Sequence, residues 1–308
     1  MDRSLAGSAR ILFITGFNRS GTTLVTSAVT EATGAATLTT GHLARQMPAL
    51  DRFLTSARKQ ATAPDRGVDQ LPVSESTPEE YGWLLQATTG ESAFTARAEQ
   101  AGVLHALIEE LAGESETKIV VLKNPSDTCQ EQLLLDTFPG SRVLIVRREL
   151  AAIEASVDRA FARMVTSNRY LRALITDRRQ AAETLGAIID PKARQRLVLD
   201  SVRKTRRDAR RLARQAQALP ADRVAFLSYD ELRADPRAGA AWAAHLLDPD
   251  ALAQAITDLT FPEYNRPRSA SWKGRIVDWY WARAWRRARA RQVRAGILPR
   301  TPPAGPRS

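Results

Sequence analysis

The residues best suited to chemistry form a glycine-bounded loop at residues 16–23, Gly-Phe-Asn-Arg-Ser-Gly-Thr-Thr. Such a loop, between a strand and a helix, presents backbone N–H groups and a helix N-terminus to a phosphate. The spacing is that of a Walker A loop, but Thr22 replaces the lysine that reaches the β- and γ-phosphates of a nucleoside triphosphate. The loop predicts an anion site in which Arg19 supplies the charge. The alternative is an ordinary strand-to-helix turn with Gly21 as its turn residue.

Four short apolar runs rich in β-branched residues predict the strands that position this loop. They are residues 11–14, 119–122, 143–146 and 224–227. Each run precedes a segment compatible with a helix, which is typical of a parallel sheet covered by helices on both faces. We therefore expect an α/β fold, a three-layer sandwich around a central parallel sheet, with ligands at the carboxyl ends of the strands.

Composition narrows the class of protein. Of the 308 residues, 44% are hydrophobic and 26% are charged, which is typical of a soluble globular protein. The net charge of +11 attracts anions without choosing among nucleotides, acidic lipid and nucleic acid. A single cysteine, Cys129, excludes an intramolecular disulfide. The N-terminus has no apolar signal segment and no run approaches the ~18 apolar residues of a membrane span, so we expect a cytoplasmic location.

Residues 18–24, Asn-Arg-Ser-Gly-Thr-Thr-Leu, resemble the 5'-phosphosulfate-binding loop of the sulfotransferases that depend on 3'-phosphoadenosine-5'-phosphosulfate (PAPS). The family pattern is P-R-S-G-T-T-x-L or a close variant, in which Asn18 here replaces the proline and Val25 the final leucine. The resemblance implies a P-loop-like sulfotransferase fold with PAPS as donor. It also implies that the donor is bound by Arg19, Ser20, Gly21, Thr22 and Thr23.

A second segment resembles the family's 3'-phosphate element, in which an arginine ends a strand and a serine follows eight positions later. That spacing matches Arg148 with Ser156. The family's R-D-P reads R-E-L here, which leaves Arg147 as a close competitor. A guanidinium at a strand end and a hydroxyl two turns into the next helix can converge on one phosphate. The alternative is a surface arginine pair near a helical serine.

Three further segments look like family motifs and occur in the family's order. Lys123 lies in a segment similar to L-K-x-P, where it would meet the bridging oxygen as the sulfuryl group leaves. Tyr229 lies in a stretch similar to Y-E-D-L-x-x-D-P, near the adenine, unless it closes a core. Residues 272–279 partly match R-K-G-x-x-G-D-W, so the resemblance places Lys273 and Gly274 over the 3'-phosphate.

Sulfuryl transfer needs in-line placement and charge stabilisation more than covalent catalysis. Arg19 and Lys123 would neutralise the developing charge without a metal ion, and the product is adenosine 3',5'-bisphosphate. Family members supply a general base as His or Glu near the acceptor. His42 lies in the corresponding stretch and is the expected base, with a role at a helix start as the alternative. Asp127, or a carboxylate from the lid, comes next.

We expect one sulfotransferase domain over residues 1–300. Residues 43–117 would form a helical lid insertion on the acceptor side, and residues 301–308 a disordered tail. The acceptor segment matches no motif. The acceptor is expected to be a hydroxyl, or less often an amine, of a small molecule, glycan or lipid.

Residues 272–298 form a basic, tryptophan-rich segment, with an amphipathic helix expected from residue 276 to 294. Aromatic rings beside a basic face suit a membrane surface with anionic head groups. The alternatives are docking of the rings on the core and packing in a homodimer. No nucleic-acid-reading module is recognisable, so nucleic acid is not an expected partner.

Two rival functions stay open. A P-loop kinase or NTPase would bind ATP with Mg²⁺, but Thr22 and the lack of a persuasive Walker B carboxylate count against it. A nucleotide-binding module of the same fold without catalysis is the other rival, because the sequence offers several candidates for the general base.

Overall fold

The computed structural model describes residues 9–59, 66, 72–259 and 272–298. Within these residues, five parallel strands form one sheet in the order β2-β3-β1-β4-β5. The strands are β1 (Arg10–Gly16), β2 (Ala36–Thr37), β3 (Ile119–Lys123), β4 (Arg142–Arg147) and β5 (Val224–Ser228). The four predicted strands are therefore confirmed, and β2 is an addition too short to show a pattern.

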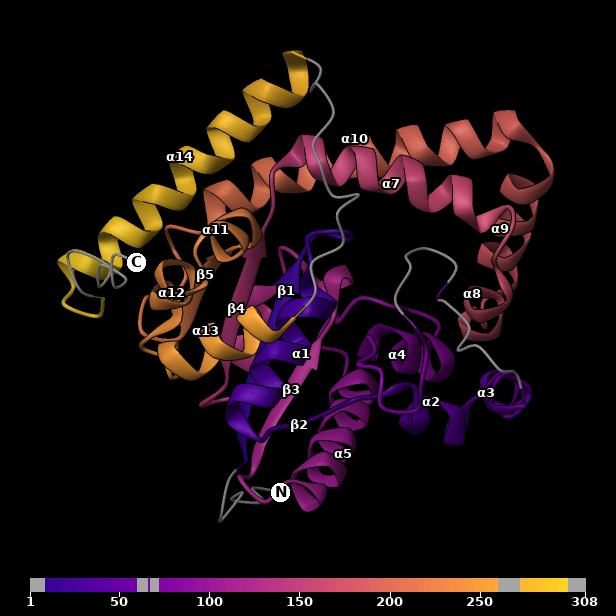
Figure 1. Ribbon diagram of the computed structural model, residues 1–308, viewed down its shortest axis with the longest axis horizontal. Coiled ribbons are helices and arrows are strands. Elements are labelled where there is room, and N and C mark those ends of the chain that lie inside the picture. Colours follow the sequence, from indigo (N-terminus) through magenta and orange to yellow (C-terminus); the bar gives the residue numbers. More distant parts are fainter. Residues whose placement is uncertain (1–8, 60–65, 67–71, 260–271, 299–308) are drawn as a thin grey trace.

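Helices occupy most of the remaining described chain (Figure 1). The first six are α1 (Thr22–Thr33), α2 (Thr40–Gln46), α3 (Pro48–Arg58), α4 (Tyr81–Thr89), α5 (Ala98–Glu114) and α6 (Glu131–Thr137). The next four are α7 (Leu150–Met164), α8 (Arg169–Leu174), α9 (Arg178–Ile189) and α10 (Pro191–Gln215). The last four are α11 (Tyr229–Ala234), α12 (Pro236–Ala240), α13 (Pro249–Asp258) and α14 (Trp272–Arg294). None of the described helices is long and apolar enough to cross a membrane.

Side chains of β1 alternate between two hydrophobic clusters, one on each face of the sheet. Ile11 and Phe13 belong to a cluster that includes residues of α5, α6, α7, α10 and α14. Leu12 and Ile14 belong to a second cluster with residues of α1, α11, α12 and α13. The predicted α/β fold, with a central parallel sheet between two helical layers, is thereby confirmed.

The position of β1 in the middle of the sheet places its loop between two other strand ends. In the register of the sheet, Ile14 of β1 lies beside Lys123 of β3, and Gly16 lies beside Val146 of β4. Side chains that follow β3 and β4 therefore flank the loop after β1 from both sides. This is the edge at which open parallel sheets bind ligands.

The helical insertion expected over residues 43–117 contains α3, α4, α5 and most of α2. It meets the sheet at Glu80, whose backbone forms a parallel bridge with Lys123. It meets α8 where the rings of Phe53 and Tyr170 lie with centroids 5.4 Å apart. Figure 1 shows α7 and α10, which contact each other, running across the top of the view toward α9 and α8. The expected tail, residues 301–308, lies outside the described residues.

Candidate active site

The loop between β1 and α1 needs glycine because another element packs directly on it. Gly21 has φ +93°, and a Cβ atom there would lie 2.3 Å from Cδ2 of Tyr229. No side chain larger than hydrogen fits such an approach. Tyr229 is buried and lines the same cavity as the loop. The loop is therefore closed on one side by the tyrosine ring at the start of α11.

Ser20 gives the loop an unsatisfied polar group. Its side chain is fully buried, and Oγ has no hydrogen-bond partner within the described part of the chain. Buried polar groups nearly always have a partner, so an orphaned hydroxyl in a loop of this type points to a ligand that supplies one. The neighbouring N-terminus of α1 adds backbone N–H groups that favour an anion.

Two arginines join the loop to the segment that follows β4. Nε of Arg19 donates a hydrogen bond of 3.1 Å to Oγ of Ser156, on α7. Nη1 of Arg148 donates one of 2.9 Å to the carbonyl oxygen of Arg19, and its guanidinium lies 4.8 Å from the centre of the Tyr229 ring. Burial lowers the pKa of Arg148, and the charge of Arg19 acts in the same direction. An anion bound between these two cations would raise the pKa of Arg148 again, because an opposite charge favours the charged form.

Arg147 and Arg148, the two candidates for the 3'-phosphate, have different surroundings in the structure. Arg148 lines the cavity that contains the loop. Nη2 of Arg147 lies 3.3 Å from Oδ1 of Asp278, so this side chain fixes α14 to the end of β4. The structure therefore brings Arg148 and Ser156 to the loop and assigns Arg147 to a contact between elements.

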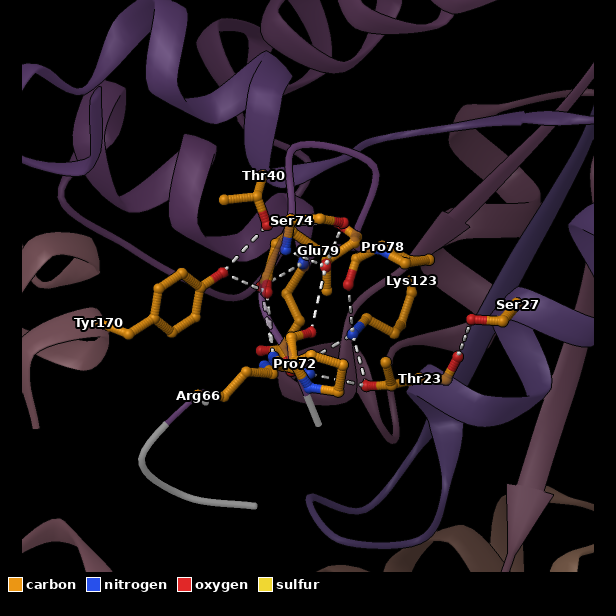
Figure 2. A network of polar contacts seen from close by, with 12 residues as sticks. Thr23, Ser27, Thr40, Arg66, Pro72, Ser74, Pro78, Glu79, Lys123 and Tyr170 are labelled. Atoms are coloured by element: carbon orange, nitrogen blue, oxygen red, sulfur yellow. Dashed lines mark hydrogen bonds and ion pairs between the residues drawn. The ribbon is translucent and has the colours of Figure 1, made fainter. Parts of the chain in front are cut away.

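A second pair of cations meets the loop from the side of β3 (Figure 2). Nζ of the fully buried Lys123 lies 2.8 Å from Oγ1 of Thr23, and Nη1 of Arg66 lies 3.3 Å from the same oxygen. Arg66 also pairs with the buried Glu79 at 3.1 Å, and Glu79 accepts a hydrogen bond of 2.5 Å from the hydroxyl of Tyr170. The network fixes Arg66 at the start of α1, a position that the sequence analysis missed.

One cavity of about 360 Å³ lies beside these groups. The buried side chains of Ser20, Lys123 and Ser156 lie behind its lining and contact residues that form it or the loop. Its loop end is lined by Asn18, Arg19, Gly21, Thr22, Thr23 and Arg148. Its far end is lined by side chains of the helices that lie over the carboxyl edge, namely α4, α7, α8, α9 and α10. A donor at the loop and a second substrate under the helices would thus share one enclosure.

Glu80 is the carboxylate that lines this cavity within the described residues. Its side chain is 20% exposed, and Oε1 lies 4.0 Å from Nζ of Lys123. Burial raises the pKa of Glu80, while the charge of Lys123 opposes that rise. A carboxylate with a raised pKa at the floor of a cavity is suited to accept a proton. A lid carboxylate is the reserve base expected from the sequence, but no local pattern marks Glu80 as that residue.

A model of the sulfotransferase family matches residues 12–242, which is most of the chain. The chain belongs to the sulfotransferase family. Among solved structures, it is similar to sulfotransferase STF1 from Mycobacterium tuberculosis H37Rv, with 15% identity, a TM-score of 0.48, and coverage of 89% of this chain and 77% of that one. It is also similar to sulfotransferase STF9 from Mycobacterium avium, with 15% identity, a TM-score of 0.48, and coverage of 93% of this chain and 76% of that one.

A third similar structure is the sulfotransferase domain of the Synechococcus PCC 7002 olefin synthase. It is 16% identical with a TM-score of 0.39, and the alignment covers 89% of this chain and 95% of that domain. No curated protein matches the sequence.

His42, the general base expected from the sequence, does not line the cavity beside the loop. Its Nδ1 lies 2.7 Å from Oγ1 of Thr39, completing a capping box at the start of α2. Its Nε2 lies 2.9 Å from Oε2 of Glu114. The ring lines a separate surface depression with Arg45 and Glu75. The ring of His42 therefore caps the start of α2, which is the alternative role expected from the sequence.

Asp127, the other reserve base, is also a structural residue. Its fully buried carboxylate accepts hydrogen bonds from the hydroxyl of Tyr81, from Nδ2 of Asn124 at 3.0 Å and from the backbone nitrogen of Phe94 at 2.6 Å. Burial raises its pKa to about 6 although these bonds act against the rise. The carboxylate does not line the cavity and instead ties α4 to the chain after β3.

Lys273 and Gly274, expected over the 3'-phosphate, lie in the first turn of α14. Gly274 is buried near the start of α14, and the side chain of Lys273 lies outside the described residues, so its expected 3'-phosphate contact does too. The helix itself lies close to the loop, because the ring of Trp281 packs 4.8 Å from that of Phe17. Its inner rings thus dock on the core, as one of the alternatives predicted.

Proposed function

We propose that this sulfotransferase uses PAPS as donor and transfers its sulfuryl group to an acceptor hydroxyl, releasing adenosine 3',5'-bisphosphate. The observation that carries the proposal is the convergence of Arg19, Arg148 and Lys123 on a phosphate-type loop that lacks the Walker lysine. The orphaned hydroxyl of Ser20 in that loop supports the fit of an anionic ligand. Bound PAPS supplies an activated sulfuryl group with a phosphate as its leaving group.

The 5'-phosphosulfate and the 3'-phosphate of the donor would bind to different residues around the loop. Ser20, Thr22 and Thr23, with the N-terminus of α1, would hold the 5'-phosphosulfate. Arg148 and Ser156 would hold the 3'-phosphate, because both side chains already meet at Arg19. The ring of Tyr229 lies against Gly21 and under the guanidinium of Arg148, and an adenine would lie beside it.

Catalysis is assigned to Lys123 and Glu80. The ammonium of Lys123, fixed by Oγ1 of Thr23, would neutralise the charge that develops on the bridging oxygen. The carboxylate of Glu80 would hold the acceptor hydroxyl and accept its proton. Burial raises the pKa of Glu80, and the charge of Lys123, 4.0 Å away, opposes that rise. Proton acceptance and charge neutralisation would therefore act at adjacent atoms.

The rival functions explain less of this geometry. A kinase or NTPase would place a lysine where Thr22 stands, and Lys123 approaches the loop from β3 instead. A module without catalysis would need no carboxylate beside that lysine, whereas Glu80 lines the cavity there. We further propose a cytoplasmic location, in keeping with Cys129 as the one cysteine.

A labelling experiment tests the proposal. The purified protein, given ³⁵S-labelled PAPS and a mixed panel of alcohols, should transfer label to an acceptor and release adenosine 3',5'-bisphosphate in equal amount. A Lys123→Ala variant should bind the bisphosphate yet transfer no label. Transfer of ³²P from γ-labelled ATP, with no transfer from PAPS, would replace this proposal by the kinase.

A further inference from the structure

The far end of the active-site cavity is built from apolar side chains of three helices. α4 contributes Trp83, α7 contributes Val157 and Phe161, and α8 contributes Leu171 and Leu174. These helices come from different parts of the chain, and all of them turn an apolar side chain toward one space. Such a wall binds a second substrate through apolar contact.

The charged residues that line the cavity gather at its loop end. In the part of the chain that the structure describes, they are Arg19, Arg66, Glu80 and Arg148. Arg19 belongs to the loop, and Arg148 donates a hydrogen bond to the carbonyl oxygen of Arg19. Arg66 donates a hydrogen bond to Oγ1 of Thr23 and forms an ion pair with Glu79. Glu80 lies beside Lys123. The apolar wall therefore offers no charge to a substrate body.

The polar groups of the wall, within the described residues, are few. Gln180 and Ser201 line the cavity from α9 and α10, and Oε1 of Gln180 accepts a hydrogen bond of 2.7 Å from Nε2 of Gln86. The hydroxyl of Tyr170 is bonded to Glu79, and Nε1 of Trp83 is a buried donor without a partner in the described part of the chain. These groups can bond a few hydroxyls at most, so a sugar placed on the apolar wall would bury hydroxyls without partners, and a carboxylate or phosphate there would lose its hydration without gaining a cation.

We infer that the acceptor is an uncharged alcohol or phenol with an apolar body, which excludes glycans and anionic acceptors. The inference rests on the proposed function. In the transfer, the acceptor oxygen forms the new bond to sulfur and the bond between sulfur and the phosphate oxygen of PAPS breaks. The electron pair leaves with adenosine 3',5'-bisphosphate, and the hydroxyl proton passes to Glu80. The apolar wall holds the body while Glu80 holds the hydroxyl.

Two naphthols of the same ring shape but different charge test this inference. 2-Naphthol and 6-hydroxy-2-naphthoate share one ring system, and glucose provides a polar comparison. Each is titrated by calorimetry into the protein saturated with adenosine 3',5'-bisphosphate, and each is tested as an acceptor of ³⁵S from PAPS. We expect 2-naphthol to bind at least 30-fold more tightly than either of the others and to accept the label.

A variant of the wall should invert this preference. Leu171 is partly exposed, so Leu171→Lys should fold and should favour the naphthoate. Leu185, which is 40% exposed on α9 and does not line the cavity, provides the matched control, and Leu185→Lys should change nothing. Equal or tighter binding of the naphthoate or glucose by the unmodified protein, or no binding of 2-naphthol, overturns the inference. Failure of the bisphosphate itself to bind counts instead against the proposed function.

The outer face of α14 carries a second inference on separate observations. Its inner rings, Trp281 and Trp285, are buried and pack on Phe17 and Phe226. On the opposite face, Ile276, Trp279 and Tyr280 are 55%, 56% and 43% exposed. The core therefore accounts for the inner rings and leaves three large apolar side chains on one turn of the helix in solvent.

The charge of this face decides its partner. The exposed arginines of α14 are Arg275, Arg283, Arg286, Arg287 and Arg294. The guanidinium of Arg283 lies 5.4 Å from the centre of the Trp279 ring. The acidic residue of α14, Asp278, is already paired with Arg147. We propose that this face docks on a bilayer with anionic head groups, because apolar rings would enter the interface while the arginines meet phosphates.

Vesicle sedimentation tests the docking. The protein should bind vesicles of phosphatidylcholine and phosphatidylglycerol in equal parts, and should bind phosphatidylcholine alone at least tenfold more weakly. Trp279→Ser with Tyr280→Ser should weaken binding to the mixed vesicles by at least tenfold and leave bisphosphate binding unchanged. Leu185→Ser, at an exposed apolar site elsewhere, is the control. The proposal fails if the double variant binds as the unmodified protein does, or if its main effect is to dissociate a dimer in light scattering.

Discussion

Nε of Arg19 donates a hydrogen bond of 3.1 Å to Oγ of Ser156, a residue 137 positions further along the chain. The bond joins the loop after β1 to the helix after β4. The bond from Arg148 to the carbonyl oxygen of Arg19 joins the same two segments at 2.9 Å. Two motifs that the sequence presents separately therefore form one site, and a substitution in either should affect donor binding.

Arg148→Ala should weaken binding of adenosine 3',5'-bisphosphate by about 10- to 100-fold, because it removes charge-assisted hydrogen bonds to a phosphate. Arg147→Ala is the matched control. Its guanidinium contacts Asp278, so donor affinity should change little. Calorimetric titration of both variants measures the difference, and equal losses would show that the 3'-phosphate lies elsewhere.

Gly21→Ala should abolish donor binding, because the new Cβ would lie 2.3 Å from the ring of Tyr229 and displace it. Gly90→Ala separates this clash from backbone strain. Gly90 also has a left-handed φ, +79°, but a Cβ there would contact nothing within 4 Å. Gly90→Ala should therefore cost only stability, by about 1 kcal/mol. Normal bisphosphate binding by Gly21→Ala would contradict the packing of Tyr229 on the loop.

Glu80→Gln should lower kcat by about 10²- to 10⁴-fold, the usual contribution of a general base, with donor affinity unchanged. Only ionised Glu80 can accept a proton, and burial raises its pKa above the ordinary value. Activity of the unmodified enzyme should therefore fall as the pH drops through that raised pKa. The variant should lose this acidic limb.

His42→Ala serves as the comparison for the base assignment, since its ring caps α2 and contacts Glu114. Its turnover and pH profile should match those of the unmodified enzyme. A loss of turnover in His42→Ala together with normal turnover in Glu80→Gln would return the base to the histidine.

Asp127→Asn should lower the free energy of unfolding by about 1–3 kcal/mol. Three donors face the two carboxylate oxygens, and an amide nitrogen in place of one oxygen cannot accept from them. Urea denaturation followed by circular dichroism measures the change. Unchanged stability would mean that the buried network contributes little, and that Asp127 is free for another role.

The sequence predicted the strands and the loop because both are local patterns. Apolar β-branched runs formed β1, β3, β4 and β5, whereas β2, with two residues, is too short to carry a pattern. Lys123, Arg148 and Ser156 reached the loop because parallel strands bring their carboxyl ends to one edge.

Glu80, which we propose as the general base, could not be located in the same way. The position of Glu80 in the site depends on a parallel bridge with Lys123, 43 positions away. The position of Arg66 depends on buried contacts with Glu79 and Thr23. Neither contact has a local signal. His42 presents the opposite case, because a residue that its local sequence favoured as the base uses its ring as a helix cap.

We propose that the loop binds a phosphosulfate nucleotide and not a nucleoside triphosphate. Isothermal titration of the full chain with adenosine 3',5'-bisphosphate and with ATP, each with and without Mg²⁺, tests it directly. We predict that the bisphosphate binds equally well in both buffers and that ATP does not bind in either. Binding of ATP that requires Mg²⁺, with no binding of the bisphosphate, would show that the loop is a nucleoside triphosphate site.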